Sequence, residues 1–233
     1  MNKVAIAFLT KDKVELSKRT IESLLQPDKF DLHWFDGSAT AAALKFISDT
    51  NGGASVHTNV LGGPDAAVAY ALTQLLRHGA DYTHIGLCEN DVLLHRDWFG
   101  PTFALFARGA AEGLDVGAVS ARCYDDRIPI QRDGYAAVHN LGWGMVLFTR
   151  EAAQLTLQNM RTCWTTETRR VFAQLTGRDI AKSWAFRASE NNLCADWHND
   201  AVLASHGFAS LALTPSLVEM IGQDPPLAQQ GLR

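Results

Sequence analysis

The sequence opens on a continuous apolar run from Val4 to Leu9, and this run limits the possible folds more than any other feature. A strand whose successive residues are all apolar must be covered on both faces, as in the parallel sheets of α/β proteins. The next segment has apolar residues at helical spacing from Val14 to Leu25, and Pro27 ends it. A buried strand followed at once by an amphipathic helix predicts a βα unit.

Short apolar runs and helical segments alternate through most of the chain. Strands are predicted at 32–35, 55–58, 83–88, 116–120 and 144–148. Helices are predicted at 41–47, 66–77 (with Asp65 as its cap), 98–111, from Arg150 onward, and at 197–205. This order predicts an α/β fold with a mostly parallel central sheet and helices on both faces. We expect one domain over residues 1–223 and a tail at 224–233 that has little to bury.

Composition and charge exclude several classes of protein. The formal net charge is -4, which argues against a nucleic-acid-binding surface. No apolar run reaches the roughly 18 residues that a membrane-spanning helix needs, and the first run lacks the features of a signal peptide. The 4 cysteines have no CxxC spacing, which argues for reduced thiols and against a thiolate zinc site. We therefore expect a cytoplasmic protein without a transmembrane segment.

Polar side chains follow three of the predicted strands, where each strand ends. Thr10, Asp36 and the segment Glu89-Asn90-Asp91 hold these positions. The carboxyl ends of parallel strands meet at one edge of a sheet, and ligands bind there. Carboxylate oxygens suit Mg²⁺ or Mn²⁺, so Asp91 is the first candidate metal ligand, with Glu89 beside it. The alternative for 89–91 is an ordinary polar turn after a strand.

Segments spread over nearly the whole chain resemble the inverting, family 2-like GT-A glycosyltransferases, and they occur in the order of that family. These segments are 8–11 with 18–24, 34–38, 59–75, 89–99, 142–151, 196–207 and 214–222. Among them, 34–38 resembles the family's DDGS turn and 89–91 its DxD motif. The resemblance implies a GT-A fold and transfer of a sugar from a nucleotide-sugar to an acceptor hydroxyl with inversion. It also implies a nucleotide-binding half over about 1–95 and an acceptor-binding half over about 96–223.

The resemblance assigns donor binding to residues at the ends of the early strands, namely Thr10, Lys11, Asp36, Glu89, Asn90 and Asp91. Asp36 would accept a hydrogen bond from the nucleotide base or ribose, although an Asx turn with Ser38 is its structural alternative. Asp91 and Glu89 would hold Mn²⁺ or Mg²⁺, which neutralises the leaving diphosphate.

An inverting transferase also needs a general base that takes the proton of the acceptor hydroxyl. The family has this aspartate near the start of a late helix, and Asp196 fits the spacing to Gly207. Asp200, one helical turn later, is the competing candidate, and either one could instead cap the helix. For the acceptor or sugar, the resemblance points to Trp143 as an exposed stacking aromatic, with core packing as its alternative. It also points to Gly142 and Gly144 as points of close backbone approach, and to His139.

The sequence departs from the family pattern at two positions. Met220 falls where the family has a metal-binding histidine, and a thioether is a poor ligand for Mn²⁺ or Mg²⁺. Glu219 is the candidate that could replace it. Ala195 precedes Asp196 where the family has an acidic residue. A transferase that depends little on metal and uses basic side chains for the diphosphate is therefore an open alternative.

Two further functions stay open. A nucleotidyltransferase shares the strand–helix alternation, but Thr10-Lys11-Asp12-Lys13 has no glycine where such enzymes carry a glycine-rich loop. A GT-A domain that binds a nucleotide-sugar or glycan without catalysis would explain Ala195 and Met220. The expected partners are a nucleotide-sugar donor and a glycan, lipid-linked or small-molecule acceptor. By resemblance the setting is bacterial surface-polysaccharide synthesis, in the cytoplasm or at the inner face of the membrane.

Overall fold

The protein is described by a computed structural model that covers residues 3–26, 28–51, 54–58, 60, 64–78, 81–123, 130–138, 141–160 and 195–221. His139 and the tail 224–233 lie outside these residues. Among the helices of the described ranges, none combines the length and the apolar character needed to cross a bilayer.

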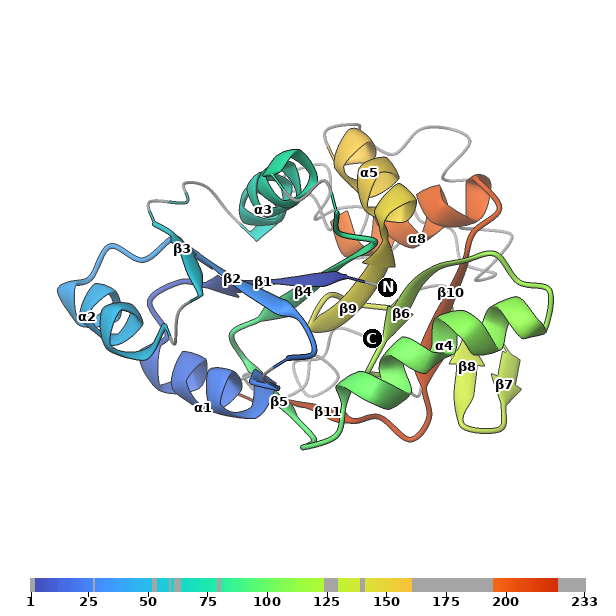
Figure 1. The fold of residues 1–233 in the computed structure, drawn as a ribbon, viewed down its shortest axis with the longest axis horizontal. Coiled ribbons are helices and arrows are strands. Elements are labelled where there is room, and N and C mark those ends of the chain that lie inside the picture. Colours follow the sequence, from blue (N-terminus) through green and yellow to red (C-terminus); the bar gives the residue numbers. More distant parts are fainter. Residues whose placement is uncertain are drawn as a thin grey trace, which may run out of the picture.

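A 9-stranded sheet forms the centre of the molecule, in the order β3-β2-β1-β4-β9-β6-β10-β8-β7 (Figure 1). Its strands are β1 (Val4–Thr10), β2 (Asp31–Asp36), β3 (Ser55–His57), β4 (His84–Glu89), β6 (Val116–Ser120), β7 (Ile130–Arg132), β8 (Tyr135–Ala137), β9 (Met145–Thr149) and β10 (Ala209–Leu213). β3, β2, β1 and β4 are parallel to one another. β9 runs against β4 and β6, while β10 is parallel to β6. The sheet is therefore mostly parallel in strand direction, as the sequence predicts.

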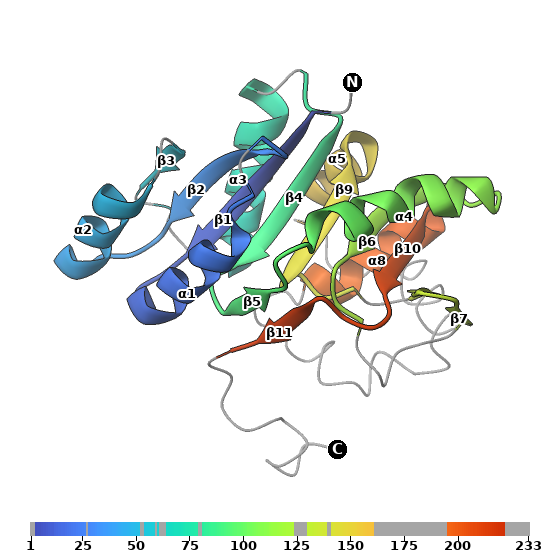
Figure 2. The same cartoon turned by 60° about the horizontal axis from the view of Figure 1, so that its bottom comes forward.

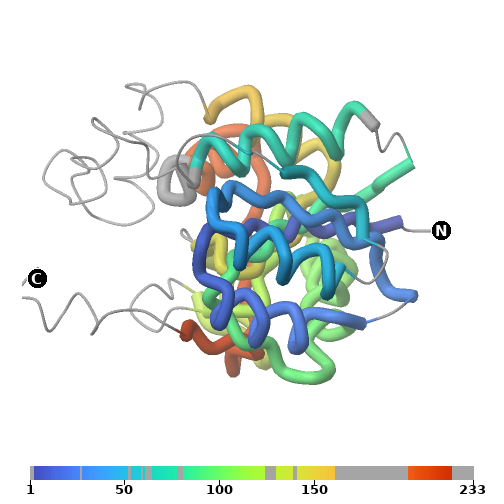
Figure 3. Tube along the Cα trace, turned by 90° about the vertical axis from the view of Figure 1, so that its left-hand side faces the viewer, coloured from blue at the N-terminus to red at the C-terminus, as the bar shows by residue number. Residues whose placement is uncertain are grey.

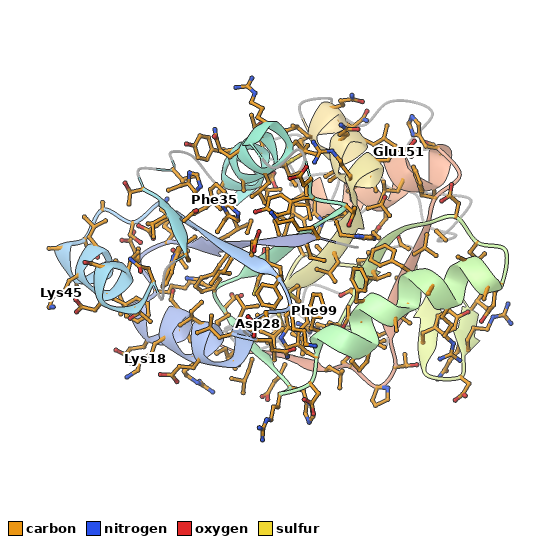
Figure 4. All side chains as sticks on the ribbon, viewed as in Figure 1. Lys18, Asp28, Phe35, Lys45, Phe99 and Glu151 are labelled. Atoms are coloured by element: carbon orange, nitrogen blue, oxygen red, sulfur yellow. The ribbon has the colours of Figure 1, made fainter. Side chains whose placement is uncertain are left out.

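Helices cover both faces of this sheet. α3 (Pro64–His78), α5 (Arg150–Asn159) and α8 (Ala195–Ser205) lie on one face, and α1 (Val14–Leu24), α2 (Ala41–Thr50) and α4 (Phe99–Ala111) on the other. Viewed along the sheet in Figure 3, the teal tube of α3 and the blue tube of α1 lie on opposite sides of the strands. Phe35 and Phe99 point inward on opposite faces, whereas Lys18 and Lys45 project outward from α1 and α2 (Figure 4).

The apolar run that opens the sequence explains this layered arrangement. Every residue of β1 is buried. Successive side chains of a strand point to opposite faces, so Ala5, Ala7 and Leu9 join the core under α3 and α5. Val4, Ile6 and Phe8 join the core under α1 and α4. A single strand thus contributes to two cores, which requires helices on both sides of it.

A second, 2-stranded sheet joins distant parts of the chain. β5 (Val92–Leu94) follows the turn after β4, and β11 (Val218–Met220) pairs with it in antiparallel register, Met220 opposite Val92. Figure 2 shows the two strands side by side beyond the ends of β1 and β4. The sequence analysis missed these strands, as well as β7, β8 and β10. Asp65 lies inside the first turn of α3 and does not precede it, so its predicted capping position is wrong.

Candidate functional site

The loops that follow β1 and β2 meet around the buried carboxylate of Asp36, which is 0% exposed. Thr10 donates its hydroxyl hydrogen to Asp36 Oδ1 at 2.7 Å and accepts a hydrogen bond from Trp34 Nε1 at 2.8 Å. Ser38 donates from Oγ to Asp36 Oδ1 at 2.7 Å and from its backbone N–H to Oδ2 at 3.1 Å. Both oxygens are therefore engaged by the protein itself. Asp36 orients the hydroxyls of Thr10 and Ser38, which is the Asx-turn alternative named for it above.

The loop after β1 is fixed against the turn after β2. Asp12, at φ 53°, donates its backbone N–H to Ser38 Oγ at 2.7 Å, and its Oδ1 accepts from the backbone N–H of Ala39 at 3.2 Å. A Cβ on Gly37 would lie 2.7 Å from the carbonyl oxygen of Val60, so only glycine fits this turn. Asp12 and Ser38 were missed as site residues, although the Asp-Gly-Ser turn after a buried strand is the signal that points to them.

A small pocket opens between this pair of loops and α2. Trp34 and Phe46 form its aromatic wall, with ring centroids 5.7 Å apart in an edge-to-face arrangement. Hydroxyl, carboxylate and ammonium groups supply the polar part. The full lining is Thr10, Asp12, Lys13, Val14, Ser17, Trp34, Asp36, Ser38, Ala43, Phe46 and Ile47. The enclosed space is only about 10 Å³, room for about one water molecule, so a planar heterocycle could lie at the mouth of this pocket but not inside it.

The segment Glu89-Asn90-Asp91 turns between β4 and β5 at the same edge of the sheet. Asn90 donates from Nδ2 to Ser17 Oγ on α1 at 3.1 Å, so its amide holds the turn in place. The backbone N–H of Glu89 bonds to the carbonyl of Gly144 at 3.1 Å, and that of Ile221 to the carbonyl of Asp91 at 2.7 Å. The turn is thereby tied to α1, to the start of β9 and to the end of β11.

The two carboxylate oxygens of Asp91 differ, because one lies near a lysine and the other has no partner among the described residues. Its side chain is 17% exposed, and Oδ2 lies 3.6 Å from Lys13 Nζ. Oδ1 is buried and has no hydrogen-bond partner in the described part of the chain. A buried carboxylate oxygen without a partner is costly, and a bound cation or a ligand donor would relieve that cost. Nearby, burial raises the pKa of the Cys88 thiol, and Glu89 and Asp91 raise it further, so this cysteine stays a neutral thiol.

The residues around Asp91 leave a divalent ion few protein ligands. Met220 lies across from Val92 on β11, and its sulfur is 3.2 Å from the position that a Cβ on Gly144 would take. Glu219 is exposed, and strand alternation directs it to the opposite face from Met220. Its role as a replacement ligand stays a prediction. In the described ranges, no group of three or more His, Cys, Asp or Glu side chains gathers. Asp91 and Glu89 are the carboxylates at this turn that would hold Mg²⁺ or Mn²⁺.

The segment before β9 packs into the interior. Trp143 is 6% exposed and belongs to the core under α3 and α5, so the prediction of an exposed stacking aromatic is wrong. Gly144 lies so close to Met220 and Val92 that a Cβ would meet each of them at 3.2 Å. Its missing side chain therefore serves packing. Gly142 has φ 61°, a conformation that favours glycine.

The two candidate bases lie on α8, one helical turn apart. Asp200 is 4% exposed, and its oxygens accept hydrogen bonds from Leu141 N at 2.7 Å and Ser210 Oγ at 2.9 Å. This carboxylate ties α8 to β10 and to the segment before β9. Asp196 is the second residue of α8. Because α8 leads through Gly207 into β10, the start of the helix lies toward the carboxyl edge of the sheet, where Thr10 and Asp91 are found.

No family model and no curated protein matches the sequence. Solved structures do match the fold. Residues 1–349 of TarS from S. aureus align with a TM-score of 0.53 at 12% identity, over 94% of this chain and 60% of TarS 1–349. GalNAc-T7, crystallised with UDP, GalNAc and Mn²⁺, aligns with a TM-score of 0.59 at 12% identity, over 97% of this chain and 45% of that one. The chain thus spans less than two thirds of these structures. At this identity the likeness establishes the architecture, and the chain has the GT-A glycosyltransferase fold.

Proposed function

We propose that the chain is a glycosyltransferase that moves a sugar from a nucleotide-sugar to an acceptor hydroxyl with inversion. The observation that carries the proposal is the unsatisfied, buried Oδ1 of Asp91 beside a pocket with an aromatic wall and fixed hydroxyls. Both features lie at the carboxyl edge of the sheet, where α/β proteins bind ligands. GT-A folds matched to this chain include one crystallised with UDP, GalNAc and Mn²⁺, which supports a nucleotide-sugar as the donor.

In this proposal the mouth of the pocket after β1 and β2 receives the nucleoside. Trp34 is fully buried, so the half-buried ring of Phe46 is the apolar surface open to the base. Thr10 and Ser38 donate their hydroxyl hydrogens to Asp36, so they can only accept a hydrogen bond from the nucleoside. From there the diphosphate extends toward Asp91, past Lys13 and Lys11. Residues of about 1–95 thus form the donor half, and about 96–223 the acceptor half.

Asp91 and Glu89 would hold Mn²⁺ or Mg²⁺. A divalent cation bound there neutralises negative charge on the leaving diphosphate. The unsatisfied Oδ1 of Asp91 is the observation that supports a cation at this position. Asn90 contributes through its bond to Ser17, which fixes the turn that carries both carboxylates.

We assign the general base to Asp196. Its competitor Asp200 is buried, and both of its oxygens already accept hydrogen bonds from the protein. Asp200 therefore positions the helix, one turn from Asp196. As the acceptor oxygen attacks the anomeric carbon, its proton passes to the Asp196 carboxylate, and the bond from the anomeric carbon to the diphosphate oxygen breaks on the opposite face. A glycan, lipid-linked or small-molecule acceptor fits this scheme, in bacterial surface-polysaccharide synthesis by resemblance.

A screen of nucleotide-sugars tests this function. Unfolding temperature is measured with UDP-, GDP-, CMP- and dTDP-sugars, each with Mn²⁺ and with EDTA. A ligand that binds the native state raises the unfolding temperature, and the effective donor is expected to do so in wild type. Asp91→Ala should remove most of that shift, whereas Asp81→Ala, an exposed aspartate before β4, should keep it. A folded protein that responds to none of the donors would refute the proposal.

A GT-A domain that binds a nucleotide-sugar without transfer is the second candidate function. Met220, a poor metal ligand opposite Val92 on β11, is the observation that favours it. Stabilisation by a donor, combined with neither hydrolysis nor transfer of its sugar in the presence of Mn²⁺, would support this candidate over the enzyme.

A further inference from the structure

Lys13 lies beside the carboxylate on which the proposed donor site depends. Its Nζ is 3.6 Å from Asp91 Oδ2, and its side chain is 52% exposed. The backbone of Lys13 is held on the loop after β1, where its N–H bonds to the carbonyl of Lys11 at 2.7 Å. The loop is in turn fixed to the turn after β2 through Asp12 and Ser38. The base of this side chain is therefore rigid, while its charged end is partly free in solvent.

The same lysine lines the small pocket with Thr10, Trp34 and Asp36. Lys13 thus borders the pocket, and its ammonium lies beside Asp91. A diphosphate that runs from the pocket toward Asp91 must pass it. An ammonium is a compact point charge with three donor hydrogens, which suits phosphate oxygens.

The carboxylate of Asp91 calls for a positive charge nearby, but its surroundings offer few protein ligands to hold a metal ion there. Asp91 and Glu89 are the candidate carboxylates, Glu219 is exposed, and Met220 offers a thioether. Within the described ranges, no set of three metal-binding side chains forms. With so few protein ligands, an ion would bind weakly before the donor phosphates arrive.

We propose that Lys13 is a built-in cation of the donor site. In the donor-free protein its ammonium pairs with Asp91 and competes with divalent ions for that carboxylate. In the donor complex the ammonium neutralises part of the diphosphate charge, so that donor binding persists without a divalent metal. This inference rests on the proposed function, and it makes Lys13 a specificity-determining residue for diphosphate over neutral ligands.

The first test uses Mn²⁺ alone, without a donor. Mn²⁺ affinity of the donor-free protein is measured by calorimetric titration for wild type, Lys13→Met and Lys18→Met. Lys18 is the matched control because it projects from α1 away from the site (Figure 4). Exposed ion pairs are weak, so Lys13→Met should tighten Mn²⁺ binding by at least about threefold. Lys18→Met should leave the Mn²⁺ affinity unchanged. When Asp91→Asn is combined with Lys13→Met, the gain in Mn²⁺ affinity should disappear. Equal affinity in wild type and Lys13→Met would overturn the pairing with Asp91.

The second test measures binding of UDP, GDP, CMP and dTDP in EDTA and in Mn²⁺. The nucleotide that binds wild type in Mn²⁺ should also bind in EDTA, and Lys13→Met should weaken the EDTA binding by about tenfold or more. Lys13→Arg keeps the positive charge and should retain most of the nucleotide binding in EDTA. This variant therefore separates the effect of charge loss from that of misfolding. Wild-type binding that vanishes in EDTA, or Lys13→Met binding as tight as wild type, would overturn the inference. Absence of nucleotide binding in both buffers would refute the proposed function itself, while the Mn²⁺ titration still reports on the pair.

Discussion

At the scale of single residues, the chemistry at Asp91 depends on the hydrogen bonds and metal ligands that its neighbours do not supply. Asp91 carries an unsatisfied oxygen, and Met220 on the facing strand offers it neither a hydrogen bond nor a strong metal ligand. Glu219, next in sequence, carries a carboxylate that is exposed on the opposite face of β11 from Met220. Met220→His should therefore change the Mn²⁺ affinity, whereas Glu219→His should not.

Met220→His should raise the Mn²⁺ affinity of the donor-free protein by about tenfold, because it adds an imidazole ligand on the face that carries Gly144 and Val92. Calorimetric titration with Mn²⁺ measures the change. Glu219→His is the matched control, and its affinity should stay at the wild-type value. A gain in the control with none at position 220 would contradict the register of β11 against β5.

The two aspartates of α8 should separate into a chemical and a structural role. Asp196→Asn should lower the rate of sugar transfer by about a thousandfold, because it removes the general base, and leave donor binding intact. Asp200→Asn should instead lower the free energy of unfolding by about 1–3 kcal/mol, because the amide keeps one acceptor oxygen and sets an NH₂ group against a donor in place of the other. Urea unfolding and a transfer assay on both variants check the division. Full transfer activity in Asp196→Asn would move the base elsewhere.

Residue positions at the ends of strands could be predicted from the sequence, but side-chain environments could not. Thr10, Asp36 and Asp91 were expected at one edge of the sheet because each follows a buried strand. That Asp36 is closed off by Thr10 and Ser38 depends on the fold of two loops far apart in sequence. Trp143 was misjudged because two flanking glycines suggest exposure, whereas the direction of its side chain depends on how β9 enters the sheet.

At the scale of elements, a row of hydroxyls on α1 holds β5. Ser17 accepts from Asn90, Thr20 donates to the carbonyl of Val92 at 2.7 Å, and Ser23 accepts from the backbone N–H of Leu94 at 3.1 Å. The hydroxyls recur at a spacing of three residues, so they share one face of the helix. An amphipathic helix would usually bury apolar residues on this face. Here the face is polar, because its hydroxyls bond to the backbone at the edge of β5.

Thr20→Val should lower the free energy of unfolding by about 1–3 kcal/mol, because the buried carbonyl of Val92 loses its side-chain donor while the shape is kept. Urea unfolding measures the change. Thr73→Val is the control, since Thr73 bonds only to Ala69 within α3, where the helix backbone already bonds that carbonyl. A larger loss in the control than in Thr20→Val would contradict this role for α1.

Long elements with clear periodicity were predictable, and short paired ones were not. β1, α1, α3 and α4 follow from runs and spacings within each segment. β5 and β11 have 3 residues each, and their stability comes from partners more than a hundred residues away. Neither strand has a local pattern that distinguishes it from a turn, so only the assembled fold defines them.

At the scale of the whole molecule, two half-buried histidines make stability depend on pH. Burial lowers the pKa of His84, which packs against the rings of Phe103 and Phe106. Burial is the main cause that lowers the pKa of His33, and the charge of His57 is the next. Asp31 raises this pKa, while Lys3 lowers it further. The unfolded chain therefore binds more protons than the native state below the ordinary histidine value of about 6.5. Native stability should be unaffected by these groups above that pH and fall as the pH drops below it.

His84→Phe should reduce this loss, because the ring contacts are kept while the titrating group is removed. The measurement is the unfolding temperature at pH 7.5 and pH 5.5, compared as a difference within each protein. A difference in His84→Phe equal to that of wild type would assign the pH dependence to other groups.

The pairing of β5 with β11 has a consequence for how the protein is made. During synthesis the whole donor pocket and the Asp91 turn leave the ribosome well before residues 218–220, which complete the small sheet and bond to Asp91. Until then β5 is an open strand edge, available for pairing with other chains. A nascent chain is therefore at risk of aggregation during this interval. For the same reason, a fragment that ends near residue 95 would lack the partner strand of β5. It would need residues 96–223 supplied as a separate chain to complete the small sheet, which a complementation assay can measure.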